Sequence, residues 1–165
     1  MTISCRPAVP EDRAFIVDSW VESYRHCHAA GLIPMPHYNG VYRAAVNWLL
    51  DRPGVAVTVA VDDDMILGWV AVEADPVVPV RRRVRTDGRM QWTEQLESAG
   101  CPMVLYCFVK DAFRRHGIAR ALFAAAKVDL GARFLYASKT PAADRLKDKF
   151  PHARWDPLAA RFPKT

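Results

Sequence analysis

The N-terminal third of the chain alternates short extended segments with helical patterns. Residues 3–6 read as a strand, and residues 11–26 place apolar side chains three or four positions apart after a Pro-Glu-Asp start. The members of that apolar face are Ala14, Phe15, Val17, Trp20, Val21 and Tyr24. Residues 29–38 hold two prolines and a glycine, which predicts a loop. A second helix is predicted from residue 38 or 41 to residue 50, shortly before Pro53.

The remainder of the chain mixes strands and helices. β-Branched residues predict a hairpin of residues 55–61 and 65–72, joined by an acidic turn. Residues 103–109 are apolar on both faces, so we expect a central strand that is covered on both sides. A helix is predicted over residues 117–130, ended by Gly131, and a short helix over residues 92–99. This order predicts an α/β protein, and we find no internal repeat.

The most informative segment is the turn between residues 109 and 118. The sequence Arg114-Arg115-His116-Gly117-Ile118-Ala119, called the glycine turn below, connects the apolar strand to an alanine-rich helix. The start of a helix offers unpaired backbone N–H groups and a positive dipole end, which suit a phosphate or pyrophosphate. Gly117 has no side chain to keep a ligand away, and arginines match phosphate geometry. The sequence therefore predicts an anion site.

The glycine turn resembles the acyl-CoA loop of the GCN5-related N-acetyltransferases, in which Arg/Gln-x-x-Gly-x-Gly/Ala follows an apolar strand. Residues 3–14, 55–74 and 134–150 are similar to other parts of that family, so the resemblance covers most of the chain outside residues 75–101 and the C-terminal end. It implies one domain over residues 1–165. It also implies a mixed, mostly antiparallel sheet of six or seven strands, flanked by helices and splayed after the fourth strand.

The resemblance further implies acetyl-CoA as cosubstrate. Its pantetheine would bond to backbone groups of Phe108 and Val109, at the end of the fourth strand. Its pyrophosphate would rest on the backbone amides of Arg115, His116, Gly117, Ile118 and Ala119, with the Arg114 side chain beside it. Ser138 stands where relatives often carry an asparagine that contacts the cofactor.

The usual acid and base of the family are absent at the corresponding positions. The strand positions fall on Met103 and Leu105, and the helical tyrosine position falls on Arg145 or Lys147. Three candidate catalytic residues remain. Glu73 could act as base, and Tyr136 (or Tyr106) as acid. Cys107 is an even number of residues from Met103 and Leu105 on the same strand, so it could face the acetyl group as they would. The default expectation is that the protein positions two substrates while water carries the proton.

Two further segments bear on the acceptor and on metals. The loop at residues 31–37 is where the family shapes its acceptor pocket, and Leu32, Ile33, Met35 and His37 would line it. His26-Cys27-His28 suggests a metal site only weakly, because neither a third ligand group nor a Cys-x-x-Cys pair accompanies it. We expect no metal, and we expect these residues to end the first helix.

Composition narrows the class of protein. The chain has 165 residues, 51% of them hydrophobic and 25% charged, as in a soluble globular domain. It shows no membrane-spanning run and no secretory pattern, so we expect a cytoplasmic protein. Its four cysteines form no regular framework and are expected to be free thiols.

The net charge of +5 is concentrated in part at residues 81–89, which contain five arginines. We interpret this segment as a solvated loop, or else as a patch for an acidic substrate, protein or nucleic acid. Along the sequence, basic and aromatic residues do not interleave as they do in a nucleic-acid platform, so nucleic acid is the minor alternative.

The sequence thus predicts an acetyl-CoA-dependent N-acetyltransferase that acts by direct transfer. The acceptor would be an amine of a small molecule, a peptide N-terminus or a lysine. The alternative is a non-catalytic acyl-CoA-binding or protein-interaction module with the same fold. The oligomeric state stays open, and a homodimer is among the forms considered.

Overall fold

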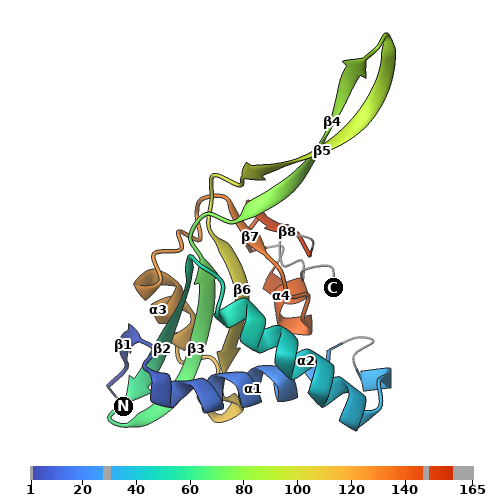
Figure 1. Ribbon diagram of the computed structural model, residues 1–165. Coiled ribbons are helices and arrows are strands. Elements are labelled where there is room, and N and C mark those ends of the chain that lie inside the picture. The colour runs from blue at the N-terminus through green and yellow to red at the C-terminus, as the bar shows by residue number, and fades with distance from the viewer. Residues whose placement is uncertain (1, 28–30, 147–148, 158–165) are drawn as a thin grey trace.

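The computed structural model describes residues 2–27, 31–146 and 149–157. Six strands form the main sheet in the order β1-β2-β3-β6-β7-β8, and β4 and β5 form a separate hairpin (Figure 1). The strands of the main sheet are β1 (Ser4–Pro7), β2 (Val55–Asp62), β3 (Met65–Glu73), β6 (Met103–Val109), β7 (Phe134–Tyr136) and β8 (Ala153–Trp155). The first four pair antiparallel, and β7 and β8 join in parallel. The predicted mostly antiparallel sheet, in a mixed α/β fold, is confirmed.

Helices cover both faces of this sheet. They are α1 (Arg13–Arg25), α2 (Met35–Leu50), α3 (Ile118–Ala125) and α4 (Pro141–Leu146). One buried core lies between α1, α2 and the sheet and contains Trp20, Trp69 and Leu105. A second core lies under α3 and contains Leu67 and Leu122. The apolar character of β6 on both faces is explained, because it contributes residues to both cores.

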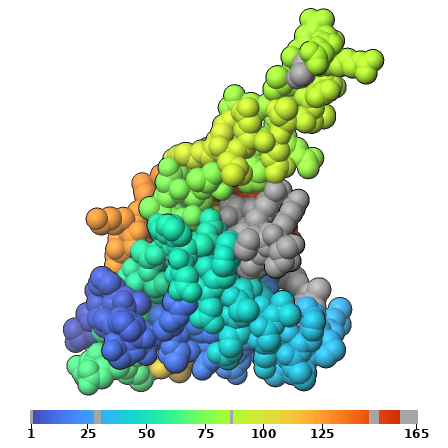
Figure 2. All heavy atoms as spheres, viewed as in Figure 1, coloured from blue at the N-terminus to red at the C-terminus, as the bar shows by residue number. Residues whose placement is uncertain are grey.

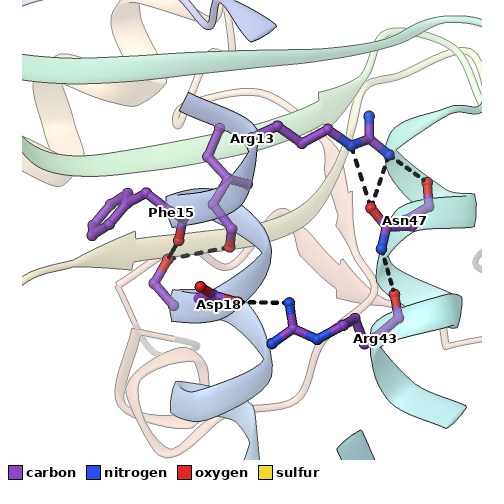
Figure 3. Close-up of polar contacts among 7 residues, drawn as sticks. Arg13, Phe15, Asp18, Arg43 and Asn47 are labelled. Atoms are coloured by element: carbon purple, nitrogen blue, oxygen red, sulfur yellow. Dashed lines mark hydrogen bonds and ion pairs between the residues drawn. The ribbon is translucent and has the colours of Figure 1, made fainter. Parts of the chain in front are cut away.

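Polar contacts fix α1 against α2 (Figure 3). The Arg13 guanidinium donates to the Asn47 Oδ1 at 3.0 Å, and the Asp18 carboxylate pairs with Arg43 at 2.6 Å. Farther in, the Trp69 indole N–H donates to the Ser19 hydroxyl at 2.9 Å and so joins β3 to α1. These contacts fix the position of α1 relative to α2 and to the sheet.

Several boundaries differ from the sequence prediction. Helix α2 begins at Met35, within the segment predicted as a loop, because Pro34 and Pro36 lie at its N-terminal end, where a missing N–H costs nothing. Helix α3 ends at Ala125 rather than near residue 130, and Lys127 then adopts a positive φ of 58°. No helix among the described residues is both long and apolar enough to cross a membrane. All four cysteines are free thiols, as predicted.

The predictions of a solvated loop at residues 81–89 and of a short helix at residues 92–99 were wrong. These residues form neither a solvated loop nor a short helix, but strands β4 (Val77–Thr86) and β5 (Arg89–Ser98), paired in register along their whole length. We call this hairpin the arm. Figures 1 and 2 show that it extends from the body of the molecule. Trp92 and Leu96 are four residues apart, as on one face of a helix, but both side chains are exposed. Because the arm buries neither face, its sequence does not show the alternation of apolar and polar residues that predicts a strand.

Candidate active site

The central feature of the site is a gap in the sheet between β6 and β7. These strands pair only at Met103↔Leu135 and Val104↔Tyr136, and the Ala137 N–H donates to the Val104 carbonyl at 3.0 Å. Strand β7 ends there while β6 continues to Val109. Beyond Val104, β6 has no neighbour on its β7 side among the described residues. The predicted splay after the fourth strand of the sheet is confirmed.

A β-bulge at Leu105 sets the orientation of β6 beyond this point. Tyr106 pairs with Ala71 and Val104 pairs with Val72, so Leu105 has no partner on β3. Leu105 and Tyr106 therefore both pack in the core under α1. After them, each residue of β6 lies on the face opposite to the one that regular alternation from Met103 would give. The expectation that Cys107 shares a face with Met103 and Leu105 was wrong: Cys107 packs with the core under α3.

The bulge also decides which backbone groups face the gap. The Lys110 N–H donates to the Leu67 carbonyl of β3 at 2.9 Å. Because hydrogen-bonded and non-bonded pairs alternate in an antiparallel ladder, Cys107 and Val109 direct their peptide groups away from β3. The two amides and the Cys107 carbonyl are available to a ligand that lies in the gap, while the Val109 carbonyl accepts from Arg114. The peptide groups of Phe108 face β3 instead, so the expectation that they would bind pantetheine was wrong.

The glycine turn lies at the end of β6. Arg115 and Gly117 adopt positive φ values of 69° and 80°, and Gly117 caps α3. The first hydrogen bond of the helix runs from the Ala121 N–H to the Gly117 carbonyl. The amides that come just before Ala121 in the chain therefore have no acceptor within the helix. A Cβ on Gly117 would meet nothing within 4 Å. This turn therefore offers amides, a positive dipole end and open space, and the anion site stays a prediction.

Arg114 connects the turn to the gap. Its Nε donates to the Val109 carbonyl at 3.4 Å, and its guanidinium pairs with Asp111 at 2.6 Å. Arg115 and His116 are exposed, and a ring nitrogen of His116 lies 3.0 Å from the Arg114 carbonyl. The Ile118 side chain is buried in the core under α3, so only its backbone can contact a ligand.

A cavity of about 470 Å³ lies at the gap, and residues from both faces of the sheet line it. On the α3 side it is lined by Arg114, Ala119 and Phe123, and on the α1 side by Ser23, His26 and Cys27. Of the residues that sequence analysis proposed for catalysis or cofactor binding, eight line it: Tyr106, Cys107, Phe108, Val109, Arg114, Ala119, Tyr136 and Ser138. Tertiary structure thus brings most of the predicted site together.

Glu73 lies elsewhere. It ends β3 opposite Met103 and does not line the cavity. Its side chain is 7% exposed and accepts from the Arg52 guanidinium at 2.9 Å, while its Oε2 has no partner among the described residues. Burial raises the pKa of Glu73, and the charge of Arg52 opposes that shift. The carboxylate is a buried partner of Arg52 at the opposite end of β6 from the glycine turn.

The other two candidates are in the cavity and hold their protons. Burial raises the pKa of the Cys107 thiol to about 12, so it is neutral at physiological pH. Burial, and then the nearby Asp144, raise the pKa of Tyr136. The Tyr106 hydroxyl lies 3.0 Å from the Ser23 hydroxyl, and burial raises its pKa as well. The raised pKa keeps each of these groups protonated at physiological pH, so none of them can act as a base, and each is a weaker acid than an exposed group of its type.

Sequence analysis did not identify His26 as a site residue. His26 ends α1, as predicted, and lines the cavity beside Ser23 and Tyr106. Its position after the helix was visible in the sequence, but its proximity to β6 was not.

The described residues contain no cluster that could hold a metal, and His28 lies outside them. Lys147 also lies outside them, as does the side chain of Arg145. Leu32 is 86% exposed, and neither it, Ile33, Met35 nor His37 lines the cavity.

Comparisons with known proteins agree with this architecture. No family model and no curated protein matches the sequence. Among solved structures, the chain is similar to a putative acetyl transferase from Pyrococcus furiosus, with a TM-score of 0.57, 17% identity, and coverage of 90% of this chain and 91% of that one. It is also similar to a histone acetyltransferase HPA2-related acetyltransferase from Corynebacterium glutamicum (TM-score 0.55, 16% identity, coverage 90% and 83%). A third is an aminoglycoside antibiotic 6′-N-acetyltransferase from Acinetobacter baumannii (TM-score 0.50, 12% identity, coverage 90% and 89%). Together with the splayed sheet, these similarities show that the chain has the fold of the GCN5-related N-acetyltransferases.

Proposed function

We propose that this chain is a single-domain N-acetyltransferase that transfers an acetyl group from acetyl-CoA directly to an amine. The observation that carries the proposal is the cavity at the gap in the sheet, which is lined by residues of the glycine turn on one face and by the end of α1 on the other. Such a cavity lets two substrates meet from opposite faces of the sheet, so that proximity supplies much of the catalysis. The similar structures, which are named acetyltransferases, support the same class of reaction.

The residues present fit acetyl-CoA. The amides of Gly117, Ile118 and Ala119 are free to bind the pyrophosphate, with Arg114 beside them. The outward amides of Cys107 and Val109 and the Cys107 carbonyl can bind the amides of the pantetheine arm, and Ser138 lines the same cavity. The cosubstrate supplies an acetyl thioester, which is the activated acyl donor.

The acceptor would bind at the α1 end of the cavity. Its amine must be neutral to form the new C–N bond, and His26 is placed there to accept the proton that the ammonium loses. When the C–S bond breaks, the departing thiolate takes a proton from Tyr136 or water, and the proton that the acylated nitrogen then releases restores that donor, so the one net proton is the one that His26 accepts. Cys107 stays a neutral thiol, so the reaction proceeds without a covalent enzyme intermediate.

A second candidate function is acyl-CoA binding without turnover. No carboxylate is among the described residues that line the cavity, and this observation favours a module that has kept the fold but lost the base. The two functions differ in one measurable property. An enzyme releases free CoA when an amine is present, whereas a binding module does not.

The experiment has two stages. Calorimetry first measures acetyl-CoA binding to the wild type, to the Arg114→Ala, Gly117→Glu double variant, and to Arg133→Gln as a control on an exposed arginine outside the cavity. We expect saturable binding that the double variant loses and the control keeps. A folded wild type that does not bind acetyl-CoA would refute both functions.

The second stage follows free thiol while a panel of amines is offered. Amine-dependent release that falls in His26→Gln, with acetyl-CoA affinity unchanged, supports the transferase. Binding without release for any amine supports the module.

A further inference from the structure

The arm has no role in the proposed transfer. Its strands have ten residues each, which gives it a length of about 33 Å. It leaves the sheet at the end opposite the glycine turn (Figure 1), and space-filling atoms show it standing clear of the body (Figure 2). Its base is fixed, because the Ala99 N–H donates to the Pro76 carbonyl at 2.9 Å and the Gly100 N–H to Asp75 at 3.0 Å. A lone two-stranded hairpin is marginally stable in water, so a ligand that covers this one would stabilise it.

The strand register places basic and aromatic side chains together. Arg83 pairs with Trp92, and Arg85 pairs with Met90, on one face of the arm. The Arg83 guanidinium lies over the Trp92 ring at 5.5 Å from its centroid, and Trp92 is 67% exposed. One basic–aromatic pair therefore forms across the arm. The sequence concealed this arrangement because it arises across the hairpin rather than along the chain.

Charge is unevenly distributed along the arm. Near its base, Arg81 pairs with Glu94 at 3.6 Å and Arg82 pairs with Glu97 at 2.8 Å, so these charges are compensated. Toward the tip, Arg83, Arg85 and Arg89 form no ion pair in the part of the chain that the structure describes. The outer half of the arm is consequently cationic: Arg83, Arg85 and the exposed Trp92 share one face, and Arg89, which pairs with Thr86, lies on the other face next to the turn.

Charge also selects among the occupants that could cover this surface. The arm holds five arginines against Asp87, Glu94 and Glu97, a net +2, which leaves +3 for the remainder of a chain whose total is +5. A second copy would therefore bring like charges together, whether it contacted the arm or the body. An anionic partner is favoured instead. Guanidinium groups match phosphates, and an exposed indole stacks on nucleobases.

We propose that the outer half of the arm binds single-stranded nucleic acid. Phosphates contact Arg83 and Arg85, and a base stacks on the Arg83–Trp92 pair. The strand reaches Arg89, on the other face, by passing round the turn. The surface lies at the opposite end of the sheet from the glycine turn, so this binding is independent of acetyl-CoA.

Fluorescence anisotropy with labelled oligouridine tests the proposal on the full chain over a range of salt concentrations. Up to three phosphate contacts predict a slope of log affinity against log salt of about −2. The Arg83→Gln, Arg85→Gln variant should reduce that slope to about −0.7 and weaken binding at low salt. Trp92→Leu should weaken binding about tenfold without changing the slope.

The matched control is Arg133→Gln, Arg154→Gln, which removes the same charge from exposed positions on the body. It should bind oligouridine as the wild type does, and circular dichroism should show all variants folded. Equal loss in the control, or competition by acetyl-CoA, would place the nucleic acid elsewhere and overturn the proposal. Tighter binding to duplex, to polyglutamate or to anionic lipid vesicles than to oligouridine would overturn it too.

Discussion

Gly68 on β3 is the position where a single methyl group should disturb the site most. A Cβ built there would lie 2.5 Å from the Phe108 carbonyl oxygen and 3.1 Å from the Val109 Cα. Both atoms belong to the backbone of β6, so neither can rotate away as a side chain would. In Gly68→Ala, β6 must therefore move by at least 0.5 Å for the first contact to reach the 3.0 Å below which real Cβ contacts do not occur.

Two quantities should change. Overpacking of this kind costs about 1–3 kcal/mol of unfolding free energy. For a chain of 165 residues, a loss of about 2 kcal/mol lowers Tm by about 4–8 °C. Moving β6 also shifts the Val109 peptide group that faces the gap. Since a misplacement of about 1 Å can cost on the order of a hundredfold, half that shift should weaken acetyl-CoA binding roughly tenfold.

Urea unfolding and calorimetry with acetyl-CoA, both well below Tm, measure the two effects separately. Gly40→Ala on α2 is the matched control, because a Cβ there meets nothing within 4 Å and alanine is the better helix former. It should raise the unfolding free energy by about 0.5–1 kcal/mol and leave acetyl-CoA affinity unchanged. A Gly68→Ala protein with the stability and affinity of the wild type would refute the reasoning.

Three further predictions concern stability and the cavity thiol. Asp12 accepts two hydrogen bonds from Arg6, which hold its pKa below the ordinary value. The Asp12 carboxylate stabilises the fold above about pH 3.9, and this stabilisation is lost as pH falls through the lowered pKa. Asp12→Asn should therefore reduce the unfolding free energy by about 1–3 kcal/mol at neutral pH and by less in acid. Urea unfolding that shows the same reduction at both pH values would contradict this. Trp69→Phe removes the donor to the Ser19 hydroxyl and should cost about 1–3 kcal/mol in the same assay, whereas an unchanged midpoint would exclude a stabilising bond. Cys107 has a pKa of about 12 and reacts as the thiolate, so its rate of reaction with iodoacetamide should still be rising at about pH 10. The Cys107→Ala variant should keep its turnover. A rate that levels off near pH 8, or a loss of turnover in the variant, would argue for a reactive thiolate.

The candidate site could be predicted only in part. Arg114 and Ala119 line the cavity, and they could be proposed from the sequence because the strand, the turn and the helix start are consecutive in the chain. The assignment of Glu73 depended on adjacency of strand ends, and the structure places its carboxylate with Arg52 outside the cavity. The parity argument for Cys107 failed because no residue type announces the bulge at Leu105.

The sequence by itself determined the elements whose period is imposed by a buried face. It determined the β2–β3 hairpin, the central strand β6 and the glycine turn, where burial and a positive φ at Gly117 constrain neighbouring residues directly. Only the tertiary structure decided the bulge, the gap beside β7, the place of His26 and the pairing of Arg83 with Trp92. The physical reason is the range of the interactions. Propensity and capping act over a few residues, whereas register and cavity walls depend on contacts between segments far apart in the chain.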